Sequence, residues 1–263
     1  MLFRSGDSLP LSAFAKFGDD CHMPQGTAAY EKRGVATDVP QWDSSKCIQC
    51  NQCAFVCPHA CIRPFLCTEE EVNNAPANAQ FLDATGFKGY KYSLAISTLD
   101  CTGCGVCLTV CPGKPLKDEA GNKVPNPALT SHTMAKSREN KEEEIFDYFA
   151  NHVTYKRDVA GTNNAKNLQF SQPLFEFSGA CGGCGETPYV KAVAQLFGDR
   201  MMVANATGCT SIYSGSYPSS PYTTNSEGRG PAWANSLFED NAEFGFGMRM
   251  AVETLREIGR AHV

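Results

Sequence analysis

One cysteine spacing occurs twice in this chain and constrains its fold more than any other feature. Two residues separate each of three cysteines from the next, and three residues separate the third from a fourth cysteine, which a proline follows. The first copy reads CIQCNQCAFVCP and the second CTGCGVCLTVCP, and they lie 54 residues apart. The eight cysteines are Cys47, Cys50, Cys53, Cys57, Cys101, Cys104, Cys107 and Cys111.

This spacing is typical of [4Fe-4S] clusters. Three thiolates in a tight loop can cover one face of a cubane, while the fourth cysteine leaves on a new path and, in two-cluster ferredoxins, reaches the other cluster. The proline ends the local helical turn because it has no N–H. The pattern therefore predicts a crossed assignment: the first cluster takes Cys47, Cys50, Cys53 and Cys111, and the second takes Cys101, Cys104, Cys107 and Cys57.

Other uses of clustered cysteines fit less well. Structural zinc sites usually show two separated CxxC pairs. Disulfide frameworks belong to short secreted chains, whereas this chain has 263 residues and its first residues contain no apolar signal-like segment. We therefore expect reduced thiols in a cytoplasmic protein. Cys21, Cys61 and Cys67 exceed the predicted ligand count, and we expect them to bind no metal.

Composition excludes several classes of protein. The formal net charge is -5, whereas nucleic-acid-binding surfaces usually carry a basic excess. No run approaches the roughly 18 apolar residues of a membrane span. We therefore expect neither a nucleic-acid nor a membrane partner. The histidines form no ligand-like pair, and we expect ordinary surface or core roles for them.

The remaining sequence predicts α+β structure. A lead-in covers 1–46, an insertion with a short helix covers 68–90, and a strand covers 91–97. A linker covers 113–136, and Ser137 is expected to cap a helix that ends near Val153. Further on, strands are expected at 174–177 and 201–204, and helices at 187–197, 232–240 and 242–258. In the helix at 187–197, Pro188 suits the first turn, Gly198 is the stop signal, and Val190, Val193, Ala194 and Phe197 are the expected buried stripe.

A second cysteine group lies in the C-terminal half. Cys181 and Cys184 occupy a glycine-rich turn before a helix, and Cys209 follows a strand, where ligands bind in α/β sheets. Three thiolates could hold part of a third cluster, with the fourth ligand a non-cysteine group or a cysteine beyond residue 263. A lone CxxC also occurs in redox and zinc sites, so spacing leaves these readings open. The loop over 207–231 is a functional-loop candidate, in which Tyr213, Tyr217 and Tyr222 either line a cleft or pack the loop.

From Leu9 onward the chain resembles the pyruvate:ferredoxin (flavodoxin) oxidoreductase family. The resemblance rests on the two cysteine motifs, on FSGACGGCGETPY and on ATGCTSIYSGSYPSSPYTTNSEGRGPAWANSLFEDNAEFGFGM. It implies oxidative decarboxylation of pyruvate with CoA to acetyl-CoA and CO2, using thiamine diphosphate and Mg2+. Electrons would pass through [4Fe-4S] clusters to ferredoxin or flavodoxin, and the full-length enzyme would be a homodimer.

The resemblance also implies residue roles and boundaries. Cys181, Cys184 and Cys209 would bind a third cluster beside the thiamine, and Glu186 and Cys209 would contact the cofactor. The family's GDG-type phosphate motif is not in this sequence. We therefore expect an interior fragment that is inactive alone: a lead-in, ferredoxin-like domain and linker over 1–145, and a truncated α/β thiamine diphosphate-binding domain over 146–263. The alternatives are a stand-alone two-cluster electron carrier and a relative that acts on another 2-oxoacid or is coupled to NADP.

Overall fold

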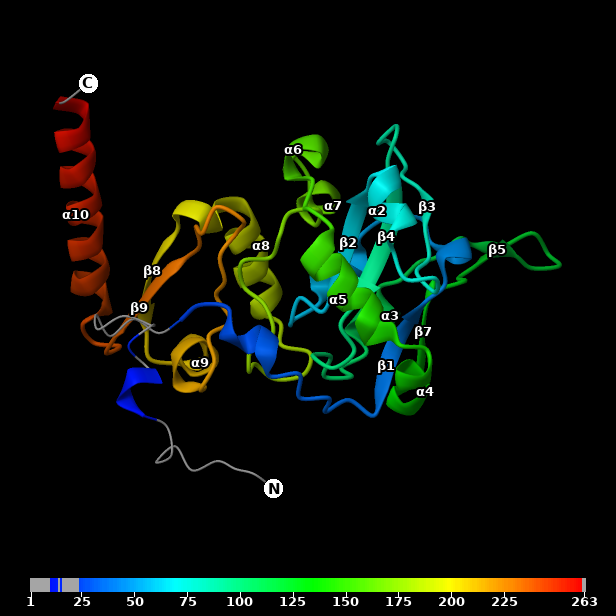
Figure 1. Ribbon diagram of the computed structural model, residues 1–263, viewed down its shortest axis with the longest axis horizontal. Coiled ribbons are helices and arrows are strands. Elements are labelled where there is room, and N and C mark those ends of the chain that lie inside the picture. Colours follow the sequence, from blue (N-terminus) through cyan, green and yellow to red (C-terminus); the bar gives the residue numbers. More distant parts are fainter. Residues whose placement is uncertain (1–9, 14, 16–23, 262–263) are drawn as a thin grey trace.

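The computed structural model describes residues 10–13, 15 and 24–261 as a mixed α+β protein (Figure 1). Cys21 and His22 lie outside the described residues. The strands are β1 (Asp38–Trp42), β2 (Ile62–Cys67), β3 (Leu82–Asp83), β4 (Lys91–Ile96), β5 (Leu116–Lys117), β6 (Lys123–Val124), β7 (Leu129–Thr133), β8 (Met202–Ala206) and β9 (Ala232–Ser236). The α-helices are α1 (Gln52–Val56), α2 (Glu69–Asn73), α3 (Val106–Thr109), α4 (Met134–Glu139), α5 (Glu142–His152), α6 (Arg157–Ala160), α7 (Ala165–Leu168), α8 (Thr187–Phe197), α9 (Cys209–Ser211) and α10 (Asn241–Ala261).

The strands around the two cysteine motifs pair in a crossed manner. β1 precedes the first motif and β4 precedes the second, while β2 and β7 follow them. β1 pairs antiparallel with β7, and β2 pairs antiparallel with β4, to which β3 adds. Each ladder thus joins a strand before one motif to a strand after the other. The predicted strand at 91–97 is confirmed as β4, and the predicted insertion at 68–90 holds α2 and β3.

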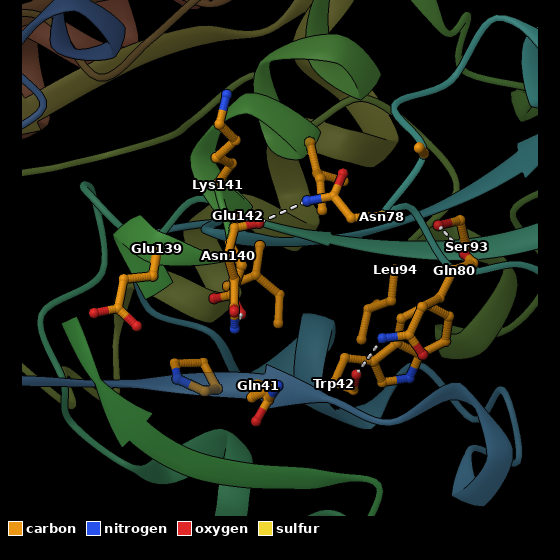
Figure 2. Close-up of a pocket in the computed structure, with 14 residues that line it drawn as sticks. Gln41, Trp42, Asn78, Gln80, Ser93, Leu94, Glu139, Asn140, Lys141 and Glu142 are labelled. Carbon is orange, nitrogen blue, oxygen red and sulfur yellow. Dashed lines mark hydrogen bonds between the residues drawn. The ribbon is translucent and has the colours of Figure 1, made fainter. Parts of the chain in front are cut away.

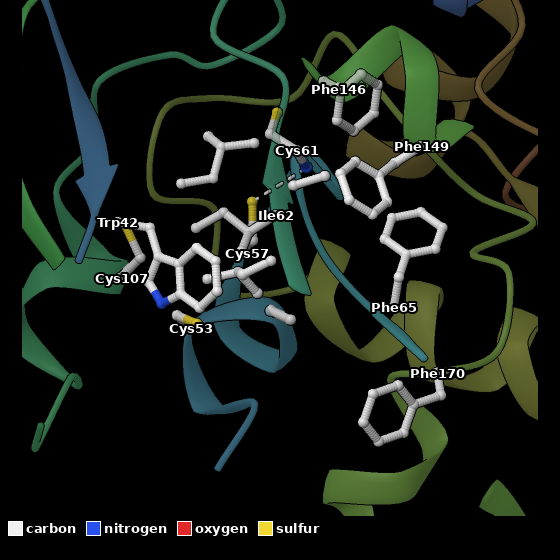
Figure 3. Packing of buried hydrophobic residues seen from close by; sticks show 14 of the residues in the cluster. Trp42, Cys53, Cys57, Cys61, Ile62, Phe65, Cys107, Phe146, Phe149 and Phe170 are labelled. Atoms are coloured by element: carbon white, nitrogen blue, oxygen red, sulfur yellow. Dashed lines mark hydrogen bonds between the residues drawn. The ribbon is translucent and has the colours of Figure 1, made fainter. Parts of the chain in front are cut away.

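The main core lies behind the cysteine motifs and is aromatic. Phe65 of β2 packs against Phe149 of α5 with ring centroids 5.2 Å apart, and Tyr92 of β4 packs against Phe170 at 6.1 Å. The thiols of this cluster lie on one side of the packing and the phenylalanine rings on the other (Figure 3). The motif loops therefore rest on a rigid hydrophobic support.

The predicted helix from Ser137 to Val153 is wrong in its start and continuity. α4 begins earlier, where the Thr133 hydroxyl accepts a hydrogen bond from the Lys136 amide at 3.3 Å, and Ser137 lies buried inside it. Lys141 has a φ of 55°, which breaks the helical path before α5 begins. Left-handed backbone at one residue is enough to separate two helices.

The C-terminal part differs from the prediction at two elements. The segment predicted as a helix at 232–240 contains β9, which pairs parallel with β8 from Met202 to Ala206. Of the predicted strand at 174–177, only Phe175 forms a bridge, to Tyr222. In both cases pairing partners distant in sequence decided the local structure. The strand at β8 and the long helix α10 are confirmed, and α10 stands at one end of the molecule (Figure 1).

Helix α8 forms as predicted but buries a different face. Pro188 lies in its first turn and Gly198 ends it. The predicted apolar stripe is partly wrong, because Val193 and Phe197 are 44% and 48% exposed. Ala194 is buried as expected, beside the polar side chains of Thr187, Lys191 and Gln195. No helix among the described residues has the length and apolarity needed to cross a membrane.

Candidate iron–sulfur centres

Two cavities group the motif cysteines in a crossed way. The first thiol cavity is lined by three cysteines of the first motif and the last cysteine of the second: Cys47, Cys50, Cys53 and Cys111. The second thiol cavity is lined by three cysteines of the second motif and the last of the first: Cys101, Cys104, Cys107 and Cys57. Cys61 also lines the second cavity, whereas Cys67 is buried away from both. All thirteen described cysteines have free thiols.

The two motif loops share one backbone design. Gln49 and Asn51 have φ values of 56° and 59°, and Gly103 and Gly105, 54 positions later, have φ values of 68° and 74°. Left-handed backbone costs little at glycine and about 1–2 kcal/mol at other residues. In the first loop, hydrogen bonds of the two side chains stabilise this left-handed backbone. Asn51 accepts one from the Tyr92 hydroxyl at 2.9 Å, and Gln49 donates one to the Asp83 carbonyl at 2.7 Å.

This loop geometry turns backbone amides toward sulfur. The amide of Gln49 donates to Cys47 Sγ at 3.3 Å, and the equivalent amide of Gly103 donates to Cys101 Sγ at 3.4 Å. Ala128 and Cys61 donate in the same way to the two crossing cysteines, Cys111 at 3.2 Å and Cys57 at 3.3 Å. Amide hydrogen bonds to ligand sulfurs are one of the means by which proteins set cluster potentials.

The surroundings of the thiols also fit an iron–sulfur cluster. The indole N–H of Trp42 is buried in the wall of the first thiol cavity and has no hydrogen-bond partner among the described residues. A buried orphan donor is costly, and a cluster sulfur would satisfy it. No three described His, Cys, Asp or Glu side chains converge on a single metal-ion position. Four thiols that line one cavity match a body of several atoms.

Burial disfavours the thiolate form of four of the eight motif cysteines, Cys47, Cys53, Cys101 and Cys107. It raises the pKa of Cys101 and of Cys107 to about 12, and it raises the pKa of Cys53 well above its usual value. Cys57 differs, because the Cys61 thiol, and after it the Lys191 ammonium, hold its pKa well below 9. Since the thiolate is the metal ligand, binding of iron would release protons from these buried thiols.

The turn that carries Cys181 and Cys184 packs against the second motif. A Cβ at Gly183 would lie 3.7 Å from Cys104 Cβ, and one at Gly182 would lie 3.5 Å from the Thr102 hydroxyl. His59 strengthens this junction, because its Nε2 donates to the Ala180 carbonyl at 2.9 Å. The predicted third thiol site therefore adjoins the second thiol cavity.

Cys209 lies where the sequence predicts it, just beyond the carboxyl end of β8. It begins α9, and its side chain is exposed, as is that of Cys181. Tyr213, in the helical turn after Cys209, lies next to the segment that carries Cys184 and Glu186. Burial, and after it the charge of Glu186, raise the pKa of Tyr213. The two segments thus come together at Tyr213, which is buried in the loop packing together with Tyr222.

Sequence reasoning missed two buried polar residues beside the thiol cavities. His59 was expected to have an ordinary role, but it lies between the second thiol cavity and Ala180. Lys191 is buried on α8 and reaches the end of α1, and burial lowers its pKa to about 8. The equivalence of Gln49 and Asn51 to Gly103 and Gly105 could have been found from the 54-residue repeat, whereas Lys191 has no such signal.

Residues 31–33 join the N-terminal segment to both halves. Lys32 forms ion pairs with Asp100, the residue before Cys101, at 3.0 Å and with Glu143 of α5 at 2.6 Å. Glu31 accepts a hydrogen bond from Ser219. Arg33 lies over the Tyr217 ring, 5.1 Å from its centroid. This segment thus connects the second motif with the loop that follows Cys209.

A separate pocket lies between β1 and the junction of α4 and α5 (Figure 2). Its lining mixes apolar and polar side chains and includes Gln80, whose Nε2 donates to the Trp42 carbonyl at 2.9 Å, and Glu142. No cysteine lines it. This pocket is therefore separate from the two thiol cavities.

The fold and the two thiol cavities define a protein with a two-cluster ferredoxin-like domain. The family model described as "4Fe-4S dicluster domain" matches residues 46–114, and the EKR model, described as "Domain of unknown function", matches residues 1–36. The chain is 55% identical over 254 residues to the pyruvate-flavodoxin oxidoreductase of Enterobacter agglomerans, and 51% identical over 250 residues to the pyruvate:ferredoxin oxidoreductase of Moorella thermoacetica. These matches cover 97% and 94% of this chain and 20% of each relative.

The chain therefore belongs, as a segment, to the pyruvate:ferredoxin (flavodoxin) oxidoreductases, and it spans about a fifth of the length of those curated relatives. It is also 48% identical over 255 residues to a protein of Cryptosporidium parvum named pyruvate dehydrogenase [NADP(+)], covering 96% of this chain and 12% of that relative. The resemblance found in the sequence motifs is confirmed.

Proposed function

We propose that this chain is the electron-relay part of an oxidoreductase that decarboxylates pyruvate with CoA to acetyl-CoA and CO2 and reduces ferredoxin or flavodoxin. The observation that carries the proposal is the grouping of eight motif thiols into two cavities. Similarity to pyruvate oxidoreductases over nearly the whole chain supports the reaction class. A stand-alone carrier would not need the turn at 181–184 that packs against the second motif.

Each thiol cavity is proposed to hold one [4Fe-4S] cluster, with the crossed ligand sets that line it. We further propose that Cys181, Cys184 and Cys209 bind a third cluster together with a ligand outside this set. The contact of Gly182 and Gly183 with the second motif supports an order of transfer. Electrons would pass from the third site to the second thiol cavity, then to the first, and then to the external carrier.

The role of this chain toward thiamine diphosphate is proposed to be local. When bound, the cofactor supplies the carbanion chemistry that breaks the carbon–carbon bond. Glu186, exposed at the start of α8, and Cys209 would contact it from the surface that faces Tyr213. Mg2+ and the phosphates have no GDG-type anchor in this sequence, so we expect the chain alone to be inactive with pyruvate.

Several finer assignments belong to the same proposal. We propose a cytoplasmic, homodimeric full-length enzyme, with a ferredoxin-like part over 1–145 and a thiamine diphosphate-binding part over 146–263. Helix α5 crosses that boundary, and Phe149 packs with Phe65 in the first part. The similarity to the NADP-named relative favours an NADP-coupled enzyme as the second candidate.

Anaerobic assembly of the chain with iron and sulfide tests the proposal. We expect about eight irons and eight sulfides per chain, and after reduction with dithionite we expect electrons to pass to ferredoxin or flavodoxin. Addition of pyruvate, CoA and thiamine diphosphate without dithionite should reduce neither carrier. A colourless chain that retains zinc but no iron under the same conditions would contradict the cluster assignment.

A further inference from the structure

Lys191 is a buried cation that reaches the loop between the two thiol cavities. Its side chain leaves α8 and is only 3% exposed. The ammonium donates to three backbone carbonyls at the end of α1: that of Ala54, that of Phe55 at 3.1 Å and that of Cys57 at 3.4 Å. A lysine ammonium has three donors, so these acceptors match its charged form.

The charge of Lys191 has no carboxylate partner among the described residues. The nearby guanidinium of Arg63 differs, because it forms a buried ion pair with Glu176. Carbonyl oxygens satisfy the hydrogen bonds of Lys191 but do not neutralise its charge. A buried charge without a counter-charge is strongly unfavourable, so the position of Lys191 calls for an anion close by.

The short segment that Lys191 holds carries cysteines of both cavities. Cys57, which lines the second thiol cavity, accepts a hydrogen bond from Lys191 through its carbonyl, and Cys53, which lines the first, lies on α1 just before it. A cubane with four thiolate ligands has a net negative charge. Each electron that arrives adds another negative charge to it, and a fixed cation nearby favours the reduced state.

We propose that Lys191 is the shared counter-charge of the two ferredoxin-type clusters and raises their reduction potentials, most strongly that of the cluster in the second thiol cavity. This inference rests on the proposed function. Its consequence is directional, because a higher potential at the second cavity draws electrons from the third site. Lys191 thus acts on the clusters through its charge and through the α1 end that leads to Cys57, and it is a positioning residue rather than a catalytic one.

Lys191→Met removes the charge, Lys191→Gln removes the charge but retains N–H donors, and Lys191→Arg retains both. Lys88→Met removes an exposed lysine and is the matched control. Each variant of this 263-residue chain is loaded with iron and sulfide without oxygen and titrated with reductant while EPR signals are recorded. In the Met and Gln variants we expect reduction of one cluster to become about tenfold less favourable, a shift of 59 mV for one electron, with a smaller shift in the other cluster.

The outcomes separate this inference from the proposed function. A wild-type chain that assembles no cluster refutes the proposed function. A wild-type chain with two clusters and a Met variant with the same potentials refutes the role of Lys191 alone. Wild-type potentials in the Arg and Lys88→Met variants support the role of charge. If the Met and Gln variants assemble no clusters, an Arg variant that does assemble them supports the counter-charge role of Lys191. An Arg variant that also assembles none overturns that role.

Discussion

Cys57→Ala is expected to remove the cluster bound mainly by the other motif. In the second thiol cavity Cys57 stands with the three leading cysteines of the second copy, including Cys104, whereas Cys50 lies in the first cavity. Loss of one ligand should therefore lower the iron content from about eight to about four per chain, with the remaining iron in the first cavity.

The structure also gives the magnitude of the stability loss. A cluster that links Cys57 to Cys101 closes a loop of about 45 residues, which by the chain-entropy relation for cross-links stabilises the folded state by about 4 kcal/mol. An uncrossed cluster, confined to Cys47–Cys57, would close a loop of about 11 residues and contribute about 2.7 kcal/mol. The crossed link is thus worth more because it restricts a longer stretch of the unfolded chain.

Double variants distinguish the two arrangements by iron content. With crossed ligands, Cys57→Ala combined with Cys50→Ala damages both clusters and leaves almost no iron, whereas Cys57→Ala combined with Cys104→Ala damages one cluster and leaves about four irons. Anaerobic urea unfolding of Cys57→Ala should show a loss near 4 kcal/mol. Cys67→Ala, a buried thiol outside both cavities, is the control and should keep its iron. The opposite pattern in the double variants would refute the crossed assignment.

Three further perturbations test the surroundings of the clusters. Trp42→Phe removes the orphan indole donor of the first thiol cavity, so a redox titration should show a lower potential for that cluster, and an unchanged potential would argue against an N–H···S contact. Burial of Lys32 opposes its charge, but Glu143 and Asp100 outweigh burial and raise its pKa above 10.5. From neutral pH up to pH 10.5 its stabilising contribution is therefore complete, and it is lost as the pH rises through the higher folded value. The gap in urea midpoint between wild type and Lys32→Met should stay constant from neutral pH to pH 10.5 and narrow above it, and a gap that narrows within that range would contradict the assignment. Gly105→Ala should cost about 1–2 kcal/mol through left-handed strain alone, whereas a Cβ at Gly103 would also lie 3.1 Å from a carbonyl oxygen. Gly103→Ala should therefore be the more destabilising in urea unfolding, and equal costs would disprove this difference.

Prediction of the C-terminal elements from sequence was limited by long-range pairing. The segment at 232–236 was predicted as helix, yet it forms β9 because β8 offers it a parallel partner. The break at Lys141 and the exposure of Phe197 on α8 likewise depend on packing that local propensity does not contain. Periodicity identifies an apolar face, but only the neighbouring elements decide whether that face is covered.

The sequence by itself determined the chemistry of the ferredoxin-like part, because thiol spacing within a short loop dictates which sulfurs can face one cluster. The repeat also predicted the crossed ligand sets, since the proline after the fourth cysteine directs the chain away from the loop that holds the first three. Only the tertiary structure decided what surrounds those sulfurs: the pairing of β1 with β7, the turn at 181–184 against Cys104, and the ammonium of Lys191 between the cavities. These contacts join residues more than 75 positions apart, and no local pattern encodes them.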